Sequence, residues 1–198
     1  SYERFARYFA PGAAALPRST FTVRPLPLLA LAAALLTGCG VVRPQLAGPS
    51  ATEGQPLQGR IKGGQQPVAG AHIYLFAANT AGYGAASLSL IDPSQPGAAT
   101  DALGTYLLTD TNGGFHLAGY TCTPGQQVYL LASGGNPGLP PGTINPALAM
   151  MTVLGACPDG ETNFDNAIRF LFVNEVTTVA SVYALSGFMA DATHVSSS

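Results

Sequence analysis

Residues 71–77 read Ala-His-Ile-Tyr-Leu-Phe-Ala, an apolar run of the length of a single β-strand. Side chains alternate between the two faces of a strand, so Ile73 and Leu75 fall on one face. Tyr74 and Phe76 fall on the other. Both faces carry apolar or aromatic groups, and this predicts a strand that is covered on both sides.

Further short apolar runs lie on either side of this segment and are separated by clusters of glycine, proline and asparagine. They occupy residues 57–62, 105–109, 115–118 and 127–132. Short strands punctuated by such turn residues are typical of an antiparallel β-sandwich. We therefore predict a mainly β domain over residues 57–173.

Residues 110–114, with the sequence Asp-Thr-Asn-Gly-Gly, separate two of these runs. Asparagine and glycine accept the positive φ that a tight turn requires. The segment is therefore predicted to close a hairpin between the strands at residues 105–109 and 115–118.

The two apolar segments that follow also alternate. For residues 147–154 a helix beginning after Asn145 is the competing interpretation, and we favour a strand. Residues 167–173 alternate more clearly, which places Phe170 and Phe172 on the same face.

Residues 174–198 are predicted to form a helix and a tail that continues beyond the given sequence. Asn174 is a favourable N-cap, and Glu175 lies at the positive end of the helix dipole. The helix is expected to end near Ser186. It carries an apolar stripe of the kind that packs against a core, composed of Val176, Val179, Ala180 and Tyr183.

The N-terminal part of the chain has the pattern of an export signal. Two arginines precede an apolar stretch at residues 25–36, which is shorter than the roughly 20 residues that cross a bilayer. The stretch runs into Leu-Thr-Gly-Cys at residues 36–39, which resembles the lipobox of bacterial lipoproteins. The resemblance implies that residues 1–38 are upstream residues and a signal peptide, and that Cys39 is acylated. A chance cysteine after an ordinary signal peptide is the alternative.

Residues 39–56 contain proline, glycine, serine and threonine without a sustained period, and we expect a flexible tether. Glycine at position 40, where aspartate often retains lipoproteins at the inner membrane, implies by the same resemblance the outer membrane of a bacterial envelope. More than one acyl chain on Cys39 would hold the protein firmly to that membrane.

Composition excludes some functions. Charged residues make up 9% of the chain, against about 25% in an average protein, and the net charge is −2. A phosphate backbone requires a basic face, so we expect no nucleic-acid partner. Nucleophile-elbow, metalloprotease and phosphate-loop motifs are missing from the sequence. We therefore expect a protein that is not an enzyme, with no catalytic residue, no cofactor and no metal site.

The remaining cysteines are expected to pair. If Cys39 is acylated, Cys122 and Cys157 are an even pair in a compartment where disulfides persist. They lack the close spacing of zinc ligands. A disulfide over their separation of 35 residues would stabilise the fold by about 4 kcal/mol. Free thiols are the alternative.

Three segments together resemble the carboxypeptidase regulatory-like domains, which are relatives of the prealbumin-like and Cna-B sandwiches. They are Gly-Arg-Ile at residues 59–61, Gln-Pro-Val-Ala-Gly-Ala-His-Ile at 66–73 and Thr-Asp-Thr-Asn-Gly-Gly-Phe-His-Leu at 109–117. The resemblance covers residues 57–135. It implies an antiparallel prealbumin-like β-sandwich in which Phe115 points inward.

Residues 78–104 depart from that family as a long insertion rich in glycine, alanine and serine. Loops of this length are often functional, so the insertion and the loop at residues 134–142 are the expected contact elements. Tyr83 and Tyr106 flank the insertion and either contact a ligand or cover the core.

The expected function is a non-catalytic cell-envelope lipoprotein whose sandwich binds or displays, with an envelope protein or glycan as its partner. The alternative is an accessory domain of a larger envelope enzyme or outer-membrane transporter.

Overall fold

The computed structural model describes residues 52–53, 56–159, 164, 168 and 170–197. The predictions on the signal peptide, on Cys39 and on most of the tether lie outside these residues. The elements are β1 (Thr52–Glu53), β2 (Leu57–Gly63), β3 (Gln66–Pro67), β4 (His72–Ala77), β5 (Leu88–Ser89), β6 (Ala99–Thr100), β7 (Thr105–Leu108), β8 (Gly114–Leu117), β9 (Thr121–Cys122), β10 (Gln127–Ser133), β11 (Ala149–Ala156), β12 (Leu171–Val173), α2 (Glu175–Leu185), β13 (Met189–Asp191) and β14 (His194–Val195). The prediction of a mainly β fold with a helix near the C-terminal end is confirmed.

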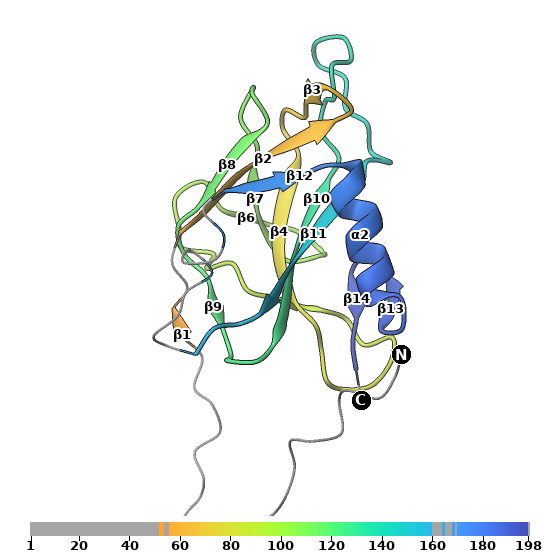
Figure 1. The fold of residues 1–198 in the computed structure, drawn as a ribbon. Coiled ribbons are helices and arrows are strands. Elements are labelled where there is room, and N and C mark those ends of the chain that lie inside the picture. The colour runs from red at the N-terminus through yellow and green to blue at the C-terminus, as the bar shows by residue number, and fades with distance from the viewer. Residues whose placement is uncertain (1–51, 54–55, 160–163, 165–167, 169, 198) are drawn as a thin grey trace, which may run out of the picture. The chain divides into compact units, whose positions relative to one another are not determined.

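The larger sheet has the strand order β11-β10-β4-β7-β6, and β5 pairs with part of β4. Strand β4 is central, because it is hydrogen-bonded to β10 on one side and β7 on the other (Figure 1). All of these pairings are antiparallel. The predicted strand at residues 147–154 is confirmed as β11, which forms one edge of this sheet.

The smaller sheet is built around β2, which pairs antiparallel with β3 and β8. Strand β12 lies on the other side of β2 and runs parallel to it, with Phe172 opposite Arg60. A wholly antiparallel arrangement is therefore wrong at this strand. Parallel neighbours need a long connection, and residues 64–170 separate these two strands along the chain.

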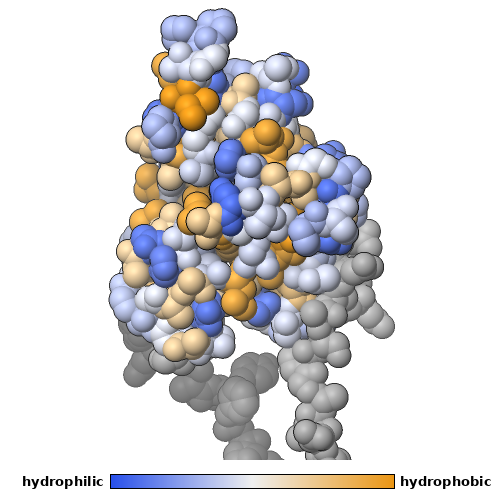
Figure 2. Space-filling model, turned by 180° about the vertical axis from the view of Figure 1, so that it is seen from behind, coloured by the Kyte–Doolittle hydropathy of each residue, from blue (hydrophilic) through white to orange (hydrophobic). Residues whose placement is uncertain are grey.

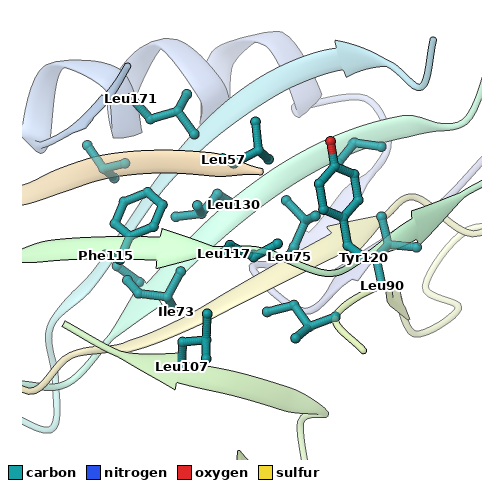
Figure 3. Close-up of a cluster of buried hydrophobic side chains, with 14 of the residues drawn as sticks. Leu57, Ile73, Leu75, Leu90, Leu107, Phe115, Leu117, Tyr120, Leu130 and Leu171 are labelled. Carbon is teal, nitrogen blue, oxygen red and sulfur yellow. The ribbon is translucent and has the colours of Figure 1, made fainter. Parts of the chain in front are cut away.

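The main core lies between the two sheets (Figure 3). Leu57 and Leu117 from the smaller sheet meet Leu75 and Leu130 from the larger one, and each is at most 1% exposed. Phe115 also points into this core, as the family resemblance implies. The core therefore joins strands that are distant in the sequence.

The other face of the larger sheet carries a second cluster. Tyr74 and Phe76 pack there with Tyr129, and side chains from β11, α2 and β14 cover them. The prediction that residues 71–77 form a strand covered on both faces is confirmed. The larger sheet is consequently a middle layer, with the smaller sheet on one side and C-terminal elements on the other.

Residues 110–114 form a tight turn, but the predicted hairpin is wrong. Strand β7 belongs to the larger sheet and β8 to the smaller one, so the turn carries the chain from one sheet to the other. The Asp110 carboxylate accepts hydrogen bonds from the backbone N–H groups of Asn112 and Gly114. The same residue types are preferred in the turns of hairpins and in turns that carry the chain from one sheet to the other. Pairing of β8 with β2 selects the crossing because it buries Phe115.

Residues 78–104 belong to the fold. They contain β5 and β6, and Leu90 and Ile91 are buried in the main core. Ile91 also forms an isolated bridge with Tyr120. The insertion therefore extends the larger sheet.

The predicted cap of the C-terminal helix is confirmed. The Asn174 side chain accepts a hydrogen bond from the Thr177 N–H, and the Thr177 hydroxyl accepts one from the Asn174 N–H. This reciprocal capping box begins α2 at Glu175.

Helix α2 lies against β11 through hydroxyl groups. The backbone N–H of Met151 donates to Thr178 Oγ1, and that of Val153 donates to Ser181 Oγ, each over 3.0 Å. Both donors belong to the edge strand of the larger sheet, and the helix runs beside that edge (Figure 1). The helix therefore supplies acceptors that a further strand would otherwise provide.

The predicted cysteine pair is brought together. The sulfur atoms of Cys122 and Cys157 lie at bonding distance, and their Cα atoms are 6.1 Å apart. Cys122 belongs to β9, which pairs with β1 at Thr52. Strand pairing thus extends into the range expected to be a tether.

Among the described residues, no helix has both the length and the apolar character needed to span a membrane.

Candidate functional site

The apolar stripe of α2 faces solvent. Val176, Val179 and Tyr183 are 76%, 71% and 83% exposed, while Ser181 and Leu185 on the opposite side are buried. A stripe of this kind ordinarily packs against a core, so its orientation differs from the expectation. The hydroxyl groups of Thr178 and Ser181 determine it, because the edge of β11 needs hydrogen-bond acceptors.

A shallow groove follows this exposed stripe. It has a volume of about 550 Å³ and is lined by Glu175, Val176, Val179, Ala180 and Tyr183. We call it the helix groove. Its lining is almost entirely apolar apart from Glu175, whose Oε1 accepts a hydrogen bond of 2.6 Å from the Gly64 N–H.

A second cleft of about 500 Å³ shares Glu175 and Val179 with the helix groove. Its opposite wall is formed by the loop before β11 and the start of that strand, including Pro137, Leu148 and Met150. Part of the loop at residues 134–142, which was expected to contact a partner, therefore borders this apolar region.

The face seen in Figure 2 differs from this region. Hydrophobic residues on it occur in small groups separated by polar ones. Such scattered exposure is ordinary for a protein surface, whereas a run of large apolar side chains along one helix is not.

The two tyrosines predicted as contact residues have different surroundings. Tyr106 is half-buried, and its ring stacks on His72 with centroids 3.9 Å apart. Tyr83 is 68% exposed, and its hydroxyl donates to the Met189 carbonyl over 3.3 Å. Tyr106 thus belongs to the packing on the larger sheet, and Tyr83 is the accessible member of the pair.

Tyr106 borders a hydrogen-bonded group of ionisable side chains. The Tyr74 hydroxyl donates to Asp101 Oδ2 over 2.6 Å, and His72 Nδ1 lies 3.2 Å from the same hydroxyl. Burial raises the pKa of Tyr74, and the Asp101 carboxylate adds to this effect. The phenol therefore remains a proton donor throughout the physiological range.

Asp101 also organises the turn before β7. Burial acts to raise the pKa of Asp101, but hydrogen bonds from Tyr74 and from the N–H groups of Leu103 and Gly104 outweigh it and lower the pKa. The Asp101 carboxylate thus connects this turn to Tyr74, which belongs to the second cluster on the larger sheet. This geometry suits a structural role for Asp101, because the hydrogen bonds that it accepts hold the backbone of Leu103 and Gly104 in place.

A second acid–histidine pair lies in the turn between β13 and β14. His194 Nδ1 is 2.9 Å from the Asp191 carboxylate, and the Thr193 N–H also donates to it. The hydrogen bonds from His194 and Thr193 lower the pKa of Asp191 from 3.8 to about 2.

This pair makes stability depend on pH. Because the pKa of Asp191 is lower in the folded protein, the native state binds fewer protons there. Its stabilising effect is present above pH 4 and is lost as the pH falls toward about 2. We expect Asp191→Asn to flatten the acid branch of a plot of Tm against pH over this interval. Parallel acid branches for the variant and the parent protein would contradict this expectation.

Within the part of the chain that the structure describes, no three histidine, cysteine or acidic side chains are grouped so that they could hold a metal ion.

Two features were missed from the sequence: the role of two helix hydroxyls, and the exposure of two phenylalanines. The hydroxyls of Thr178 and Ser181 lie opposite the apolar stripe, and their spacing of three residues was the available signal. Phe170 and Phe172 were correctly placed on one face, but periodicity does not tell which face is open. The buried residues are their neighbours Leu171 and Val173.

Comparison of the chain with known protein families, with curated proteins and with solved structures finds no significant match.

Proposed function

We propose that the chain is a non-catalytic binding module of the bacterial cell envelope, anchored by acyl chains on Cys39. Its domain is proposed to be a prealbumin-like sandwich of the carboxypeptidase regulatory-like kind. Two facing sheets with a shared core support this assignment. So does the location of the three family-like segments on β2, on β3 to β4 and on the turn from β7 to β8.

The observation that carries the binding role is the exposed stripe on α2. Residues 176, 179, 180 and 183 have the i, i+3, i+4, i+7 spacing of a helix-packing surface. Leaving large apolar side chains in water forgoes about 1.5–3 kcal/mol for each one that could be buried. A protein partner that covers the stripe would recover part of this free energy.

The chemistry of the stripe favours an apolar partner segment. Glu175 is the sole charged residue of α2, and its carboxylate already holds the Gly64 N–H. The helix carries no lysine or arginine that would attract anionic lipid head groups. We therefore assign the helix groove to an apolar segment of an envelope protein.

The test uses the full chain expressed in a Gram-negative host, with a photo-crosslinking amino acid in place of Val179. We expect a cross-linked adduct with another envelope protein, because position 179 lies in the middle of the stripe. Val176→Glu in the same chain should remove the adduct by placing an unpaired charge at the contact. The matched control carries the cross-linker at Leu103, which is 45% exposed on a turn distant in the sequence.

Three results would contradict the proposal. They are equal adducts at both positions, an adduct made only of two copies of this chain, and no adduct at position 179. The anchor is tested separately, since Cys39→Ser should move the protein from the membrane fraction to the soluble fraction. An unchanged distribution would remove the lipid anchor from the proposal.

A further inference from the structure

We propose that the outer face of the smaller sheet binds an acidic sugar, such as a uronic acid unit of a polysaccharide. This inference rests on the binding role proposed above but uses a different surface. The surface, called the sheet-face site here, consists of Gln58, Arg60, His116, Phe170 and Phe172.

Strand register places these side chains together. Gln58 and Arg60 alternate with the buried residues of β2 and are exposed on its outer side. Gln58 lies opposite His116 on β8, and Arg60 lies opposite Phe172 on β12. Three neighbouring strands thus contribute exposed side chains to a single face.

A shallow groove opens on this face. Its volume is about 420 Å³, and Gln58, Arg60, His116 and Phe170 are part of its lining. Gly114 lies opposite Arg60 on β8, and the Asp110 carboxylate occupies the space over Gly114, so a ligand reaches the guanidinium group from the side of β12. The groove therefore gives a ligand access to Arg60.

The charge of Arg60 is available to a ligand. Among the described residues, the acid–base pairs within 4.0 Å are His72–Asp101 and His194–Asp191, and Arg60 is in neither. A guanidinium group matches a carboxylate with two parallel hydrogen bonds. Asp110 also borders the groove, and its Oδ1 atom accepts from the Asn112 and Gly114 N–H groups. Arg60 favours a ligand carrying a localised carboxylate, and repulsion by Asp110 confines that carboxylate to the β12 side of the guanidinium group.

Two aromatic rings beside Arg60 favour a sugar as the carrier of that carboxylate. Phe170 and Phe172 are 44% and 58% exposed, and their ring centroids are 4.8 Å apart. Exposed phenyl faces can pack against the C–H face of a pyranose ring. Gln58 and His116 supply hydrogen-bond donors and acceptors for its hydroxyl groups.

The same geometry argues against an acidic peptide. A peptide that adds to a sheet uses the free N–H and C=O groups of an edge strand. The sheet-face site lies on the face of three paired strands, where the backbone groups of the central strand are already bonded to its neighbours. Recognition here must come from side chains, and these combine one cation and one carboxylate with two rings and two polar groups.

The test is calorimetric titration of the full chain with oligogalacturonate and with its fully methyl-esterified form. These ligands share one sugar backbone and differ in charge. We expect the acidic form to bind at least about tenfold more tightly than the ester, because the ester lacks the charge that pairs with Arg60. Arg60→Gln and Phe172→Thr should each weaken binding of the acidic form at least about tenfold.

Phe188→Thr is the matched control, since it removes an exposed phenyl ring that lines neither groove and should leave sugar binding unchanged. Thermal unfolding of each variant checks that the fold is retained. Equal binding of the acid and the ester, full binding by Phe172→Thr, or stronger binding of poly-glutamate would overturn the proposal. So would the absence of binding at millimolar oligogalacturonate. None of these results bears on cross-linking at Val179, so failure of this inference is separable from failure of the function proposed for α2.

Discussion

Replacing Cys122 and Cys157 together with alanine is expected to lower the free energy of unfolding by about 4 kcal/mol. The bridge spans 35 residues and connects β9 to the end of β11. Without it, the unfolded chain gains the entropy that the closed loop had removed. Since single domains are stable by roughly 5–15 kcal/mol, the change is a large part of the total. Urea unfolding followed by circular dichroism measures it.

Reduction provides the control for this variant. The parent protein in excess dithiothreitol should unfold at the same urea concentration as the double variant. The double variant itself should not respond to the reductant. A parent protein that keeps its unfolding midpoint under reducing conditions would show that the cysteine pair does not contribute this stability.

Gly113→Ala is expected to cost about 3 kcal/mol. Gly113 has a φ of +72°, a conformation that costs an L-residue about 1–2 kcal/mol. An added Cβ would also lie against the backbone carbonyl oxygen of Ile61, closer than real Cβ atoms approach such an atom. The turn would have to shift and weaken the hydrogen bond of 2.8 Å from the Ile61 N–H to the Gly113 carbonyl. Thermal and urea unfolding would measure the loss.

A second glycine separates the two causes. Gly142 has a φ of +81°, but a Cβ there meets nothing within 4 Å. Gly142→Ala should therefore cost only the conformational part, about 1–2 kcal/mol. Equal destabilisation by both substitutions would show that crowding at the turn from β7 to β8 is unimportant.

Local patterns in the sequence predicted the elements whose environment follows from their own residues. The run at residues 71–77 is apolar on both faces, and β4 is buried on both. Asn174 has the side chain of a helix cap, and it forms that cap. In each case the information needed lies within a few neighbouring positions.

Features of the fold that depend on strands distant in the sequence were not predictable in this way. The turn at residues 110–114 has the same residue preferences whether it closes a hairpin or crosses between sheets, and pairing of β8 with β2 decides between them. Strand β12 joins β2 in parallel because of where the chain arrives after a long connection. Neither outcome is encoded in the periodicity of the segment itself.

The candidate sites were harder to predict for the same reason. For Tyr106 the sequence left ligand contact and core cover open, and the ring stacks on His72, a diagonal neighbour on the paired strand β4. The stripe of α2 was recognised from its spacing, but hydrogen-bond acceptors required by β11 turned it outward. The spacing of apolar residues identifies the face of a helix or strand that tends to be covered. It does not identify what covers that face.

The contact between α2 and β11 has a consequence for association. Exposed edge strands recruit other chains into continuous sheets, and proteins avoid such aggregation by blocking the edge. Here the hydroxyls of Thr178 and Ser181 occupy N–H groups that an incoming strand would need. At this edge an approaching copy of the domain meets a helix and two N–H groups that are already bonded, which opposes the formation of an intermolecular ladder.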